Sequence, residues 1–340
     1  MVENWFPRFL ANGLDYLDVR RTLDAVDSWT DWPDEWEKSG DRYERLGQEA
    51  LVAGRTITAA AHLTRAALTY QFAQFVLTQD IARRESIHRR MARTYRSAAL
   101  HLRPPAEPIE VPASGAPFLG YLRSPSEGAP LVVLIPGLES TKEQFSTFEL
   151  YLLDRGMATL SFEGPGQGES WYAHPFRNAA YLSAFGALMD WISERDDLSG
   201  RPVGLLGTSF GGYLSLRCAA EAQVQAVVDI AGFHDLKGFD DLQPVIRENF
   251  AHFMKVDLHE VGDQARDVDL TGCLPVAAPV LVVHGELDAI VPVANAHKIL
   301  GAQTDAAPLL YSDGNHSCNN LHTIVRPAIA DWLAETLGGR

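Results

Sequence analysis

Hydrophobic positions follow two different spacings along the chain, and the spacing changes near residue 104. Before it, apolar residues recur every three or four positions, most clearly over 56–77 and 80–100, which is the period of amphipathic helices. After it, short apolar runs lie between glycine- and proline-rich turns, as buried strands do. The proline-rich stretch 103–108 falls at the change and indicates a boundary. The pattern therefore predicts a helical domain over 1–103 and a second domain over 104–340.

The helical domain is predicted to contain several helices, with Pro33 at the first position of one and a second piece from Gly40 to Gly54. The two longest helices, joined near Thr78, are expected to form an antiparallel hairpin. Their apolar faces, and the tryptophans that crowd the first helices, need a partner to bury them. We therefore expect this domain to cap the second one, with the proline-rich stretch as a rigid joint.

The second domain alternates strands with helices. The predicted strands are 109–112, 118–122, 131–135, 158–162, 203–206, 224–230, 279–284 and 309–311, and the predicted helices include 142–154, 180–192 and 321–337. This order predicts an α/β fold with a mostly parallel sheet covered by helices on both faces. An insertion over about 233–275 lies between two strands and is expected to form a further part of the lid.

Ser209 stands in the pattern Gly-x-Ser-x-Gly, between Gly207 and Gly211, directly after a predicted strand and before a predicted helix. This is the nucleophile elbow, a sharp turn that projects the serine hydroxyl from the edge of a sheet. Glycines flank the serine because a Cβ at either position would clash with the neighbouring strand or helix. The motif predicts Ser209 as a catalytic nucleophile.

The remaining members of a catalytic triad follow in the order that α/β-hydrolases use. Asp288 lies in the loop after the strand 279–284, and His316 lies in a turn-rich loop before the last helix. His316 would take the serine proton, and Asp288 would orient the imidazole. Glu286 is the alternative acid, because it lies in the same loop.

Two backbone N–H groups are expected to form the oxyanion hole. One belongs to Phe210, which follows the nucleophile, and the other to Leu138, in the loop after the strand 131–135. Candidate substrate-binding residues are His234, Glu139 and Tyr70. The glycine-rich stretch 163–168 is interpreted as a tight structural loop, because the lysine and hydroxyl residue of a phosphate loop are missing.

Composition limits the partners. The net charge of −15 over 340 residues argues against nucleic acid and anionic membranes. The three cysteines form no Cys-x-x-Cys pair, which favours a reducing compartment. The opening residues Met1–Asn4 carry no basic group, no apolar leader follows them, and no run is long enough to span a membrane. We therefore expect a cytoplasmic protein that binds a small molecule.

Several segments together resemble the dihydroxypseudooxynicotine hydrolase group of α/β-hydrolases. Fermentation–respiration switch proteins and fungal polyketide-shortening hydrolases look like more distant relatives. The resemblance rests on GLESTKE (137–143), LDRGMAT (153–159), GPGQGE (164–169), AGF (231–233), DGNH (313–316) and, in the helical domain, GQEAL (47–51) and AHLTRAA (61–67). It therefore covers nearly the whole chain.

The resemblance implies a helical cap over a hydrolase core, often in a homodimer, with neither a metal nor an organic cofactor. It implies cleavage of a carbon–carbon bond next to a ketone, and its triad corresponds to Ser209, Asp288 and His316. The resulting hypothesis is a hydrolase of β-diketones or aromatic ketones. A carboxylic ester or thioester hydrolase with the same residues is the alternative, and a catalytically silent binding protein on the same fold is the third.

Overall fold

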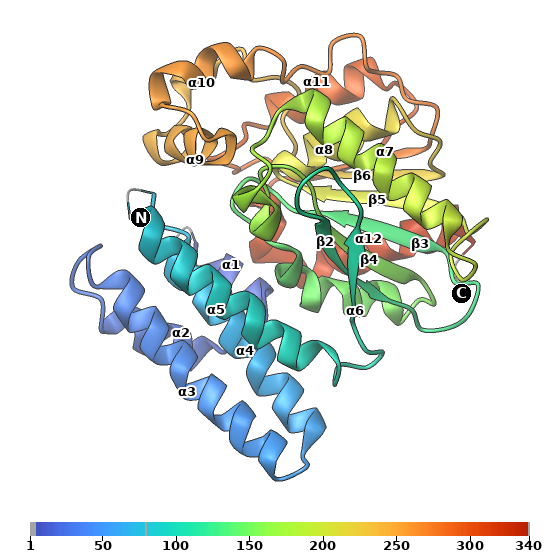
Figure 1. Ribbon diagram of the computed structural model, residues 1–340. Helices are drawn as coiled ribbons and strands as arrows, with labels where there is room; N and C mark the ends of the chain where they lie inside the picture. Colours follow the sequence, from blue (N-terminus) through green and yellow to red (C-terminus); the bar gives the residue numbers. More distant parts are fainter. Residues whose placement is uncertain (1–4, 79, 339–340) are drawn as a thin grey trace. The chain divides into compact units, whose positions relative to one another are not determined.

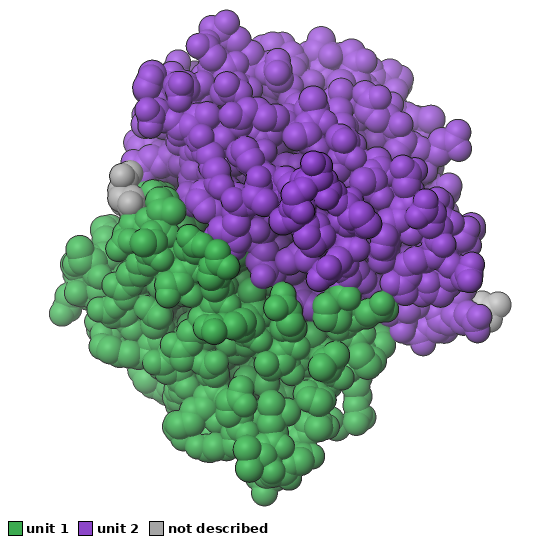
Figure 2. Space-filling model, in the orientation of Figure 1, with its two compact units in different colours: residues 1–108, 143–148 green, residues 109–142, 149–340 purple. Residues whose placement is uncertain are grey.

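The computed structural model describes residues 5–78 and 80–338 (Figure 1). Met1–Asn4, used above to judge a leader, lie outside the described residues. The chain forms two compact units, distinguished by colour in Figure 2. Unit 1 comprises residues 1–108 and 143–148, and unit 2 comprises 109–142 and 149–340. The division lies close to the boundary expected near residue 104, with the short segment 143–148 joining the helical unit.

Unit 1 is built from helices. They are α1 (Phe6–Ala11), α2 (Tyr16–Asp24), α3 (Trp32–Val52), α4 (Thr56–Gln74) and α5 (Ile81–Ala99). The two predicted pieces around Gly40 are one helix, so that prediction was wrong. Glycine weakens a helix interior, but a Cβ at Gly40 would lie 2.4 Å from the ring of Tyr70 on α4. The glycine thus serves the close packing of α3 against α4 and does not end the helix.

Aromatic side chains form the core of unit 1. Trp32 and Trp36 of α3 are almost fully buried, and the Trp36 ring lies 4.8 Å from the ring of Phe9. The Phe9 ring in turn meets that of Phe72 edge-on at 4.7 Å. The indole N–H of Trp32 donates to the carbonyl of Phe72 at 2.8 Å, which satisfies a polar group that burial would otherwise leave unpaired. These contacts tie α1, α3 and α4 together.

Unit 2 contains the sheet. Its strands are β1 (Glu107–Val111), β2 (Phe118–Arg123), β3 (Leu131–Ile135), β4 (Ala158–Glu163), β5 (Val203–Thr208), β6 (Ala226–Ile230), β7 (Val280–Gly285) and β8 (Ala307–Tyr311). The order across the sheet is β1-β2-β4-β3-β5-β6-β7-β8. β2 runs antiparallel to β4, and the strands from β4 to β8 are parallel. The predicted α/β class with a mostly parallel sheet is confirmed.

Helices pack on both faces of this sheet (Figure 1). They are α6 (Phe148–Leu153), α7 (Asn178–Glu194), α8 (Phe210–Ala219), α11 (Ala294–Ala302) and α12 (His322–Leu337). Unit 2 also contains the 3-10 turns η3 (Gly168–Tyr172) and η5 (His316–Leu321), whereas η2 (Lys142–Thr147) falls almost wholly in the segment 143–148 of unit 1. On one face, a Cβ at Gly204 would lie 2.9 Å from Leu337 of α12. On the other, α8 follows β5 and packs over β6. Burial on both faces explains the unbroken apolar run of β3.

The predicted insertion forms a module between β6 and β7. It contains η4 (Phe239–Asp241), α9 (Pro244–Met254) and α10 (Leu258–Ala265), which lie side by side in orange in Figure 1. Its two ends pair through an antiparallel bridge between Asp235 and Asp269. The N–H of Leu236 donates to the carbonyl of Val268 at 3.0 Å, and that of Leu270 to His234 at 2.9 Å. The insertion therefore leaves the sheet and returns to it at one place.

Among the described residues, no helix is both long and apolar enough to cross a membrane.

Candidate active site

Ser209 lies on a strained turn between β5 and α8. Its φ of 56° and ψ of −124° are rarely adopted by a residue with a side chain. A Cβ at Gly207 would lie 1.9 Å from the carbonyl oxygen of Gly211, and one at Gly211 would lie 2.2 Å from that of Ile135. The two glycines thus let the turn close against itself and against β3, as the motif predicts.

Asp288 and His316 are hydrogen-bonded to each other. His316 Nδ1 and Asp288 Oδ2 are 2.7 Å apart, and Asp288 is 7% exposed. The other carboxylate oxygen accepts the backbone N–H groups of Ile290 at 2.8 Å and Val291 at 2.9 Å. Burial raises the pKa of Asp288, but His316 and these N–H groups outweigh it and hold that pKa below its usual range. Glu286, the alternative acid, is exposed.

A buried histidine helps to hold the loop that carries Asp288. His284, at the end of β7, has its Nε2 2.8 Å from the carbonyl oxygen of Val291 and 3.6 Å from Asp288 Oδ2. Burial lowers the pKa of His284, so the ring is neutral. Its Nε2–H then donates to Val291, whose own N–H holds Asp288. His284 was not among the predicted site residues, since its place at the end of a predicted strand gives no sign of this role.

Asparagines fix the loop that carries His316. The N–H of Asn315 donates to Asn320 Oδ1 at 2.8 Å, and the N–H of Asn320 donates to Asn315 Oδ1 at 3.2 Å. Asn319 donates to the carbonyl of His316 at 2.8 Å. Ser317 and Cys318 have φ values of 54° and 50°, which side-chain-bearing residues seldom adopt. The asparagine contacts stabilise this strained turn, and the only sequence signal for them is the pair Asn319-Asn320.

The three predicted triad residues lie at one edge of the sheet. Ser209 follows β5, Asp288 follows β7 and His316 follows β8, and these strands are parallel. The loops after β7 and β8 touch through their backbones, because a Cβ at Gly285 would lie 2.2 Å from the carbonyl oxygen of Gly314. Carboxyl ends of parallel strands are where open α/β sheets place ligands. The arrangement suits nucleophilic catalysis by a base-activated serine.

The expected oxyanion loop lies directly against the nucleophile. A Cβ at Gly137 would be 3.2 Å from Ser209 Cβ, so the loop that carries Leu138 passes beside the serine. Phe210 begins α8, where backbone N–H groups have no partner within the helix. The N–H groups of Phe210 and Leu138 remain the predicted donors.

A buried glutamine holds the oxyanion loop in place. Gln167 is 1% exposed, and its Nε2 donates to the carbonyl oxygen of Pro136 at 2.6 Å. Its Oε1 accepts the N–H of Gly164 at 3.0 Å and the hydroxyl of Tyr181 at 3.1 Å. Gln167 therefore clamps the loop after β3 to the loop after β4. The stretch 163–168 was predicted to be structural, and its link to the loop of Leu138 has no signal in the sequence.

The same glycine-rich stretch is anchored by a buried carboxylate. Glu163 is fully buried and accepts the N–H of Lys142 at 3.0 Å, its ammonium at 2.9 Å and the N–H of Glu169 at 3.0 Å. Lys142 also pairs with Glu169 at 2.9 Å. Every one of these contacts is internal, so the stretch is a tight structural loop in the described structure.

The insertion contacts both parts of the predicted oxyanion hole. The ring of Phe210 lies 5.3 Å from that of Phe250 and 5.4 Å from that of Phe253, both on α9. Asn249, also on α9, donates to Glu139 Oε2 at 2.7 Å. Glu139, a candidate substrate-binding residue, thus joins α9 to the loop of Leu138. A change in α9 would be felt at both predicted oxyanion donors.

The other two candidate substrate-binding residues are engaged within the protein. His234 Nδ1 lies 2.9 Å from Asp235 Oδ2, at the base of the insertion. The hydroxyl of Tyr70, in unit 1, lies 2.8 Å from a carboxylate oxygen of Asp41 and 2.8 Å from one of Glu44, and its single proton is shared between them. Burial and these two carboxylates raise the pKa of Tyr70 far above its usual value. Their roles toward a substrate remain predictions.

His234, Asp235 and Asp269 bring three ligand-type groups within 4.8 Å of one another. Lys298 binds Asp235 at 2.9 Å, and Lys237 binds Asp269 at 2.9 Å. Burial raises the pKa of Asp235, but Lys298 and His234 outweigh it and hold that pKa at about 2. Two lysine ammonium groups thus balance the acids, which suits an ion-pair network better than a cation site.

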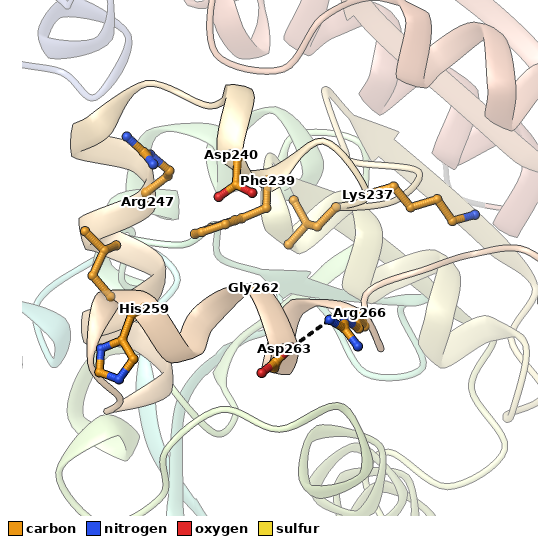
Figure 3. A pocket seen from close by; sticks show the side chains of 10 residues that line it. Lys237, Phe239, Asp240, Arg247, His259, Gly262, Asp263 and Arg266 are labelled. Carbon is orange, nitrogen blue, oxygen red and sulfur yellow. Dashed lines mark ion pairs between the residues drawn. The ribbon is translucent and has the colours of Figure 1, made fainter.

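A hollow of about 830 Å³ lies within the insertion (Figure 3). Its lining residues are Leu236, Lys237, Phe239, Asp240, Arg247, Leu258, His259, Gly262, Asp263 and Arg266. Arg266 pairs with Asp263 at 2.8 Å, three residues before it at the end of α10, at the edge of this hollow. None of the three triad residues lines this hollow, so it is separate from the predicted site of catalysis.

A serine on a nucleophile elbow, with a hydrogen-bonded Asp–His pair after later strands of a mostly parallel sheet, defines an α/β-hydrolase. Residues 143–340 match the model of the prolyl oligopeptidase family. The chain is 33% identical to 2,6-dihydropseudooxynicotine hydrolase of Paenarthrobacter nicotinovorans, over 98% of this chain and 92% of that one. The chain therefore belongs to the prolyl oligopeptidase family, in the group of that enzyme, and is a hydrolase.

Solved structures agree with this assignment. The crystal structure of the 2,6-dihydroxy-pseudo-oxynicotine hydrolase matches with a TM-score of 0.90 and 32% identity, over 97% of this chain and 95% of that one. AbyA5 matches with a TM-score of 0.78, over 96% of this chain and 91% of that one; at 22% identity it supports the fold alone. Among sequence relatives, the α/β-hydrolase pydG of Acremonium sp is 28% identical, and the match covers 66% of this chain and 57% of pydG. The resemblance stated from the sequence is confirmed.

Proposed function

We propose that this hydrolase cleaves a carbon–carbon bond next to a ketone, in a β-diketone or an aromatic ketone, with Ser209 as nucleophile. The observation that carries the proposal is the 2.7 Å bond between His316 and Asp288 at the sheet edge where Ser209 lies. The relative that is 33% identical is named for a pseudooxynicotine derivative, which supports a small organic substrate. Neither a metal nor an organic cofactor has a step in this reaction.

The reaction begins when Ser209 Oγ attacks the ketone carbon and His316 accepts the hydroxyl proton. Asp288 keeps the imidazole in the reacting tautomer and stabilises its charged form. The N–H groups of Phe210 and Leu138 would hold the oxyanion of the tetrahedral intermediate.

The carbon–carbon bond then breaks, and its electron pair leaves as a carbanion that an adjacent carbonyl or ring stabilises. His316 gives its proton to that carbon. Water, deprotonated by His316, attacks the acyl-serine, the bond between the acyl carbon and Ser209 Oγ breaks, and His316 returns the proton to Oγ. The products are one carboxylic acid and one ketone or arene. Atoms balance with one water consumed.

A panel of substrates tests this proposal. Aryl ketones and β-diketones are incubated with the enzyme alongside simple esters, and products are measured by mass spectrometry, with Ser209→Ala as control. Formation of an acid and a shortened ketone that requires Ser209 supports the proposal. Turnover of esters alone would replace it with the ester hydrolase, and no turnover together with no fluorophosphonate labelling would indicate the silent binding protein.

We further propose that unit 1 caps the site and takes part in substrate selection, and that the enzyme works as a cytoplasmic homodimer. The buried aromatic core of α1, α3 and α4 supports a rigid cap. His234, Glu139 and Tyr70 are the proposed contacts or supports of the substrate. Expression of residues 104–340 alone and assay on a bulky aryl ketone test the cap. Full selectivity in a soluble truncated protein would remove the cap from recognition, and size-exclusion chromatography tests the dimer.

A further inference from the structure

A buried carboxyl group that the reaction does not use lies beneath the nucleophile elbow. Asp229 is on β6 and pairs in register with Gly207 of β5. The next residue of β6, Ile230, accepts the backbone N–H of Ser209 at 2.7 Å. The end of β6 is therefore attached to the nucleophile's own backbone, one residue from Asp229.

Two glycines make room for this carboxyl group. A Cβ at Gly212, in the first turn of α8, would lie 2.0 Å from Asp229 Oδ1, and one at Gly232 would lie 2.1 Å from it. Asp229 is fully buried, and no side chain among the residues that the structure describes hydrogen-bonds either carboxyl oxygen; the backbone N–H of Gly232 is the polar group that acts on it. A carboxylate with so little compensation is costly in such a place, whereas a neutral acid is tolerated far better.

The surroundings favour the neutral form. Burial raises the pKa of Asp229 to about 7, while the nearby N–H of Gly232 acts in the opposite direction. The elements around it bring Gly207 from β5, Val282 from β7 and Gly212 from α8, none of which has a titratable side chain. Tyr213, the next residue of α8, has a titratable hydroxyl, which donates to Asn178 at 3.0 Å. The further titratable groups at this edge of the sheet are Asp288 and His316 of the predicted triad, which lie in the loops after β7 and β8.

We propose that Asp229 is a positioning residue of the elbow that works as a neutral acid. The first turn of α8 carries the partial positive charge of the helix end and the N–H of Phe210, the predicted oxyanion donor. A negatively charged carboxylate beside Gly212 would reduce the positive electrostatic potential at this end of α8, and that potential stabilises the oxyanion. Ionisation of Asp229 therefore lowers the rate at which Ser209 is acylated. The inference rests on the proposed function, because it requires Ser209 as the nucleophile.

The test is the rate at which a fluorophosphonate probe labels Ser209 between pH 5.5 and pH 9, in the full-length chain. We expect the wild type to show a descending limb centred near pH 7, with a drop of about tenfold. Asp229→Asn, which keeps the shape and cannot ionise, should lose the descending limb. Asp190→Asn, at an exposed position of α7, is the matched control and should keep it.

The outcomes are distinct. No labelling of the wild type at any pH overturns the proposed function itself. Labelling that rises to a plateau in the wild type, or a descending limb that survives in folded Asp229→Asn, overturns the role of Asp229. If Asp229→Asn fails to fold, two measurements on the wild type test the proposal: the pH profile of labelling and the infrared band of a protonated carboxyl group. Absence of that band at pH 6 contradicts the proposal, and its loss on raising the pH through 7 supports it.

Discussion

The acid–base half of the candidate site and its oxyanion half are built by different means. In the acid–base half, the reacting groups are side chains, and His316 bonds Asp288 directly at 2.7 Å. In the oxyanion half, the predicted groups are backbone N–H groups, and a third residue, Gln167, holds the loop that carries one of them, Leu138, through the carbonyl of Pro136. Side-chain chemistry depends on residue identity, whereas backbone chemistry depends on loop position. The two halves should therefore respond differently to substitution.

The largest effect is expected at Ser209, which serves both halves. Ser209→Ala removes the nucleophile and should lower kcat by about 10⁴-fold to 10⁶-fold without unfolding the protein. Fluorophosphonate labelling should disappear as well. Ser215→Ala removes another serine of α8, one that donates to the carbonyl of Gly212 at 2.8 Å, and should keep most of the activity. Near-normal turnover in Ser209→Ala would refute the nucleophile.

Asp288→Asn should be the next most damaging change. Loss of the carboxylate leaves His316 in the wrong tautomer, and the expected drop in kcat is about 10⁴-fold. Glu286→Gln is the matched control in the same loop, at an exposed position, and should cost less than about threefold. Kinetics of both variants on one substrate decide between the two acids. A larger loss in Glu286→Gln would reassign the acid.

Asp288 also predicts a pH dependence of stability. Although burial opposes it, His316 holds the folded-state pKa of Asp288 below its unfolded value. The unfolded chain therefore binds the proton more readily, and the stabilisation is present above about pH 4 and lost as the pH falls through the folded pKa. The Tm difference between wild type and Asp288→Asn should shrink as the pH is lowered from 6 to 3. A difference that grows toward acid would contradict this sign.

In the oxyanion half, Gln167→Leu should lower kcat by about tenfold to a hundredfold with a small change in KM. The substitution frees the loop of Leu138 and leaves buried polar groups unpaired. Gln303→Leu is the matched control, because Gln303 also bridges backbone groups, accepting from the N–H of Val276 at 2.7 Å and donating to its carbonyl at 3.0 Å. It should lower stability by a similar amount without affecting acylation. Equal reductions of kcat in Gln167→Leu and Gln303→Leu would show that Gln167 has no specific effect on the oxyanion hole.

The smallest effect is expected from Asn320→Ala in the His316 loop. Asn320 is exposed, and its contacts with Asn315 and Asp313 are worth about 1 kcal/mol together once water competes. We expect a reduction in kcat of less than about tenfold and a broader temperature dependence of activity. Asn12→Ala is the control, because Asn12 follows α1 in unit 1 and donates to the carbonyl of Arg8 at 2.8 Å. A loss as large as that of Asp288→Asn would show that the loop needs this asparagine to keep His316 in reach.

Much of the fold follows from the sequence, because the period of apolar residues reports burial directly. The alternation of strands and helices after residue 104 is borne out by the eight-stranded sheet. The helix end expected at Gly40 was wrong for a physical reason. Glycine is used both to end a helix and to let another side chain pack closely, and at Gly40 it makes room for the ring of Tyr70. Tertiary contact decides between the two, and periodicity along one helix contains no information on it.

The candidate site divides in the same way. Ser209, Asp288 and His316 could be predicted because each has a motif and a fixed order in the chain. His284 and Gln167 could not, because their partners, the carbonyls of Val291 and Pro136, are backbone groups that every sequence contains. Asp229 was equally hidden, since an aspartate in a strand reveals its burial only when Gly212 and Gly232 close around it.

The paired ends of the insertion have a consequence for how this enzyme can change over evolution. Because residues 234–236 and 268–270 bond to each other, the segment between them begins and ends at one point of the sheet. A segment of different length can replace it without shifting the register of β6 against β7. Since α9 meets Phe210, each replacement presents a new surface to the residue beside the nucleophile. The bridge between Asp235 and Asp269 thus lets the inserted segment vary in sequence and length while the sheet and the loops of the predicted triad keep their structure.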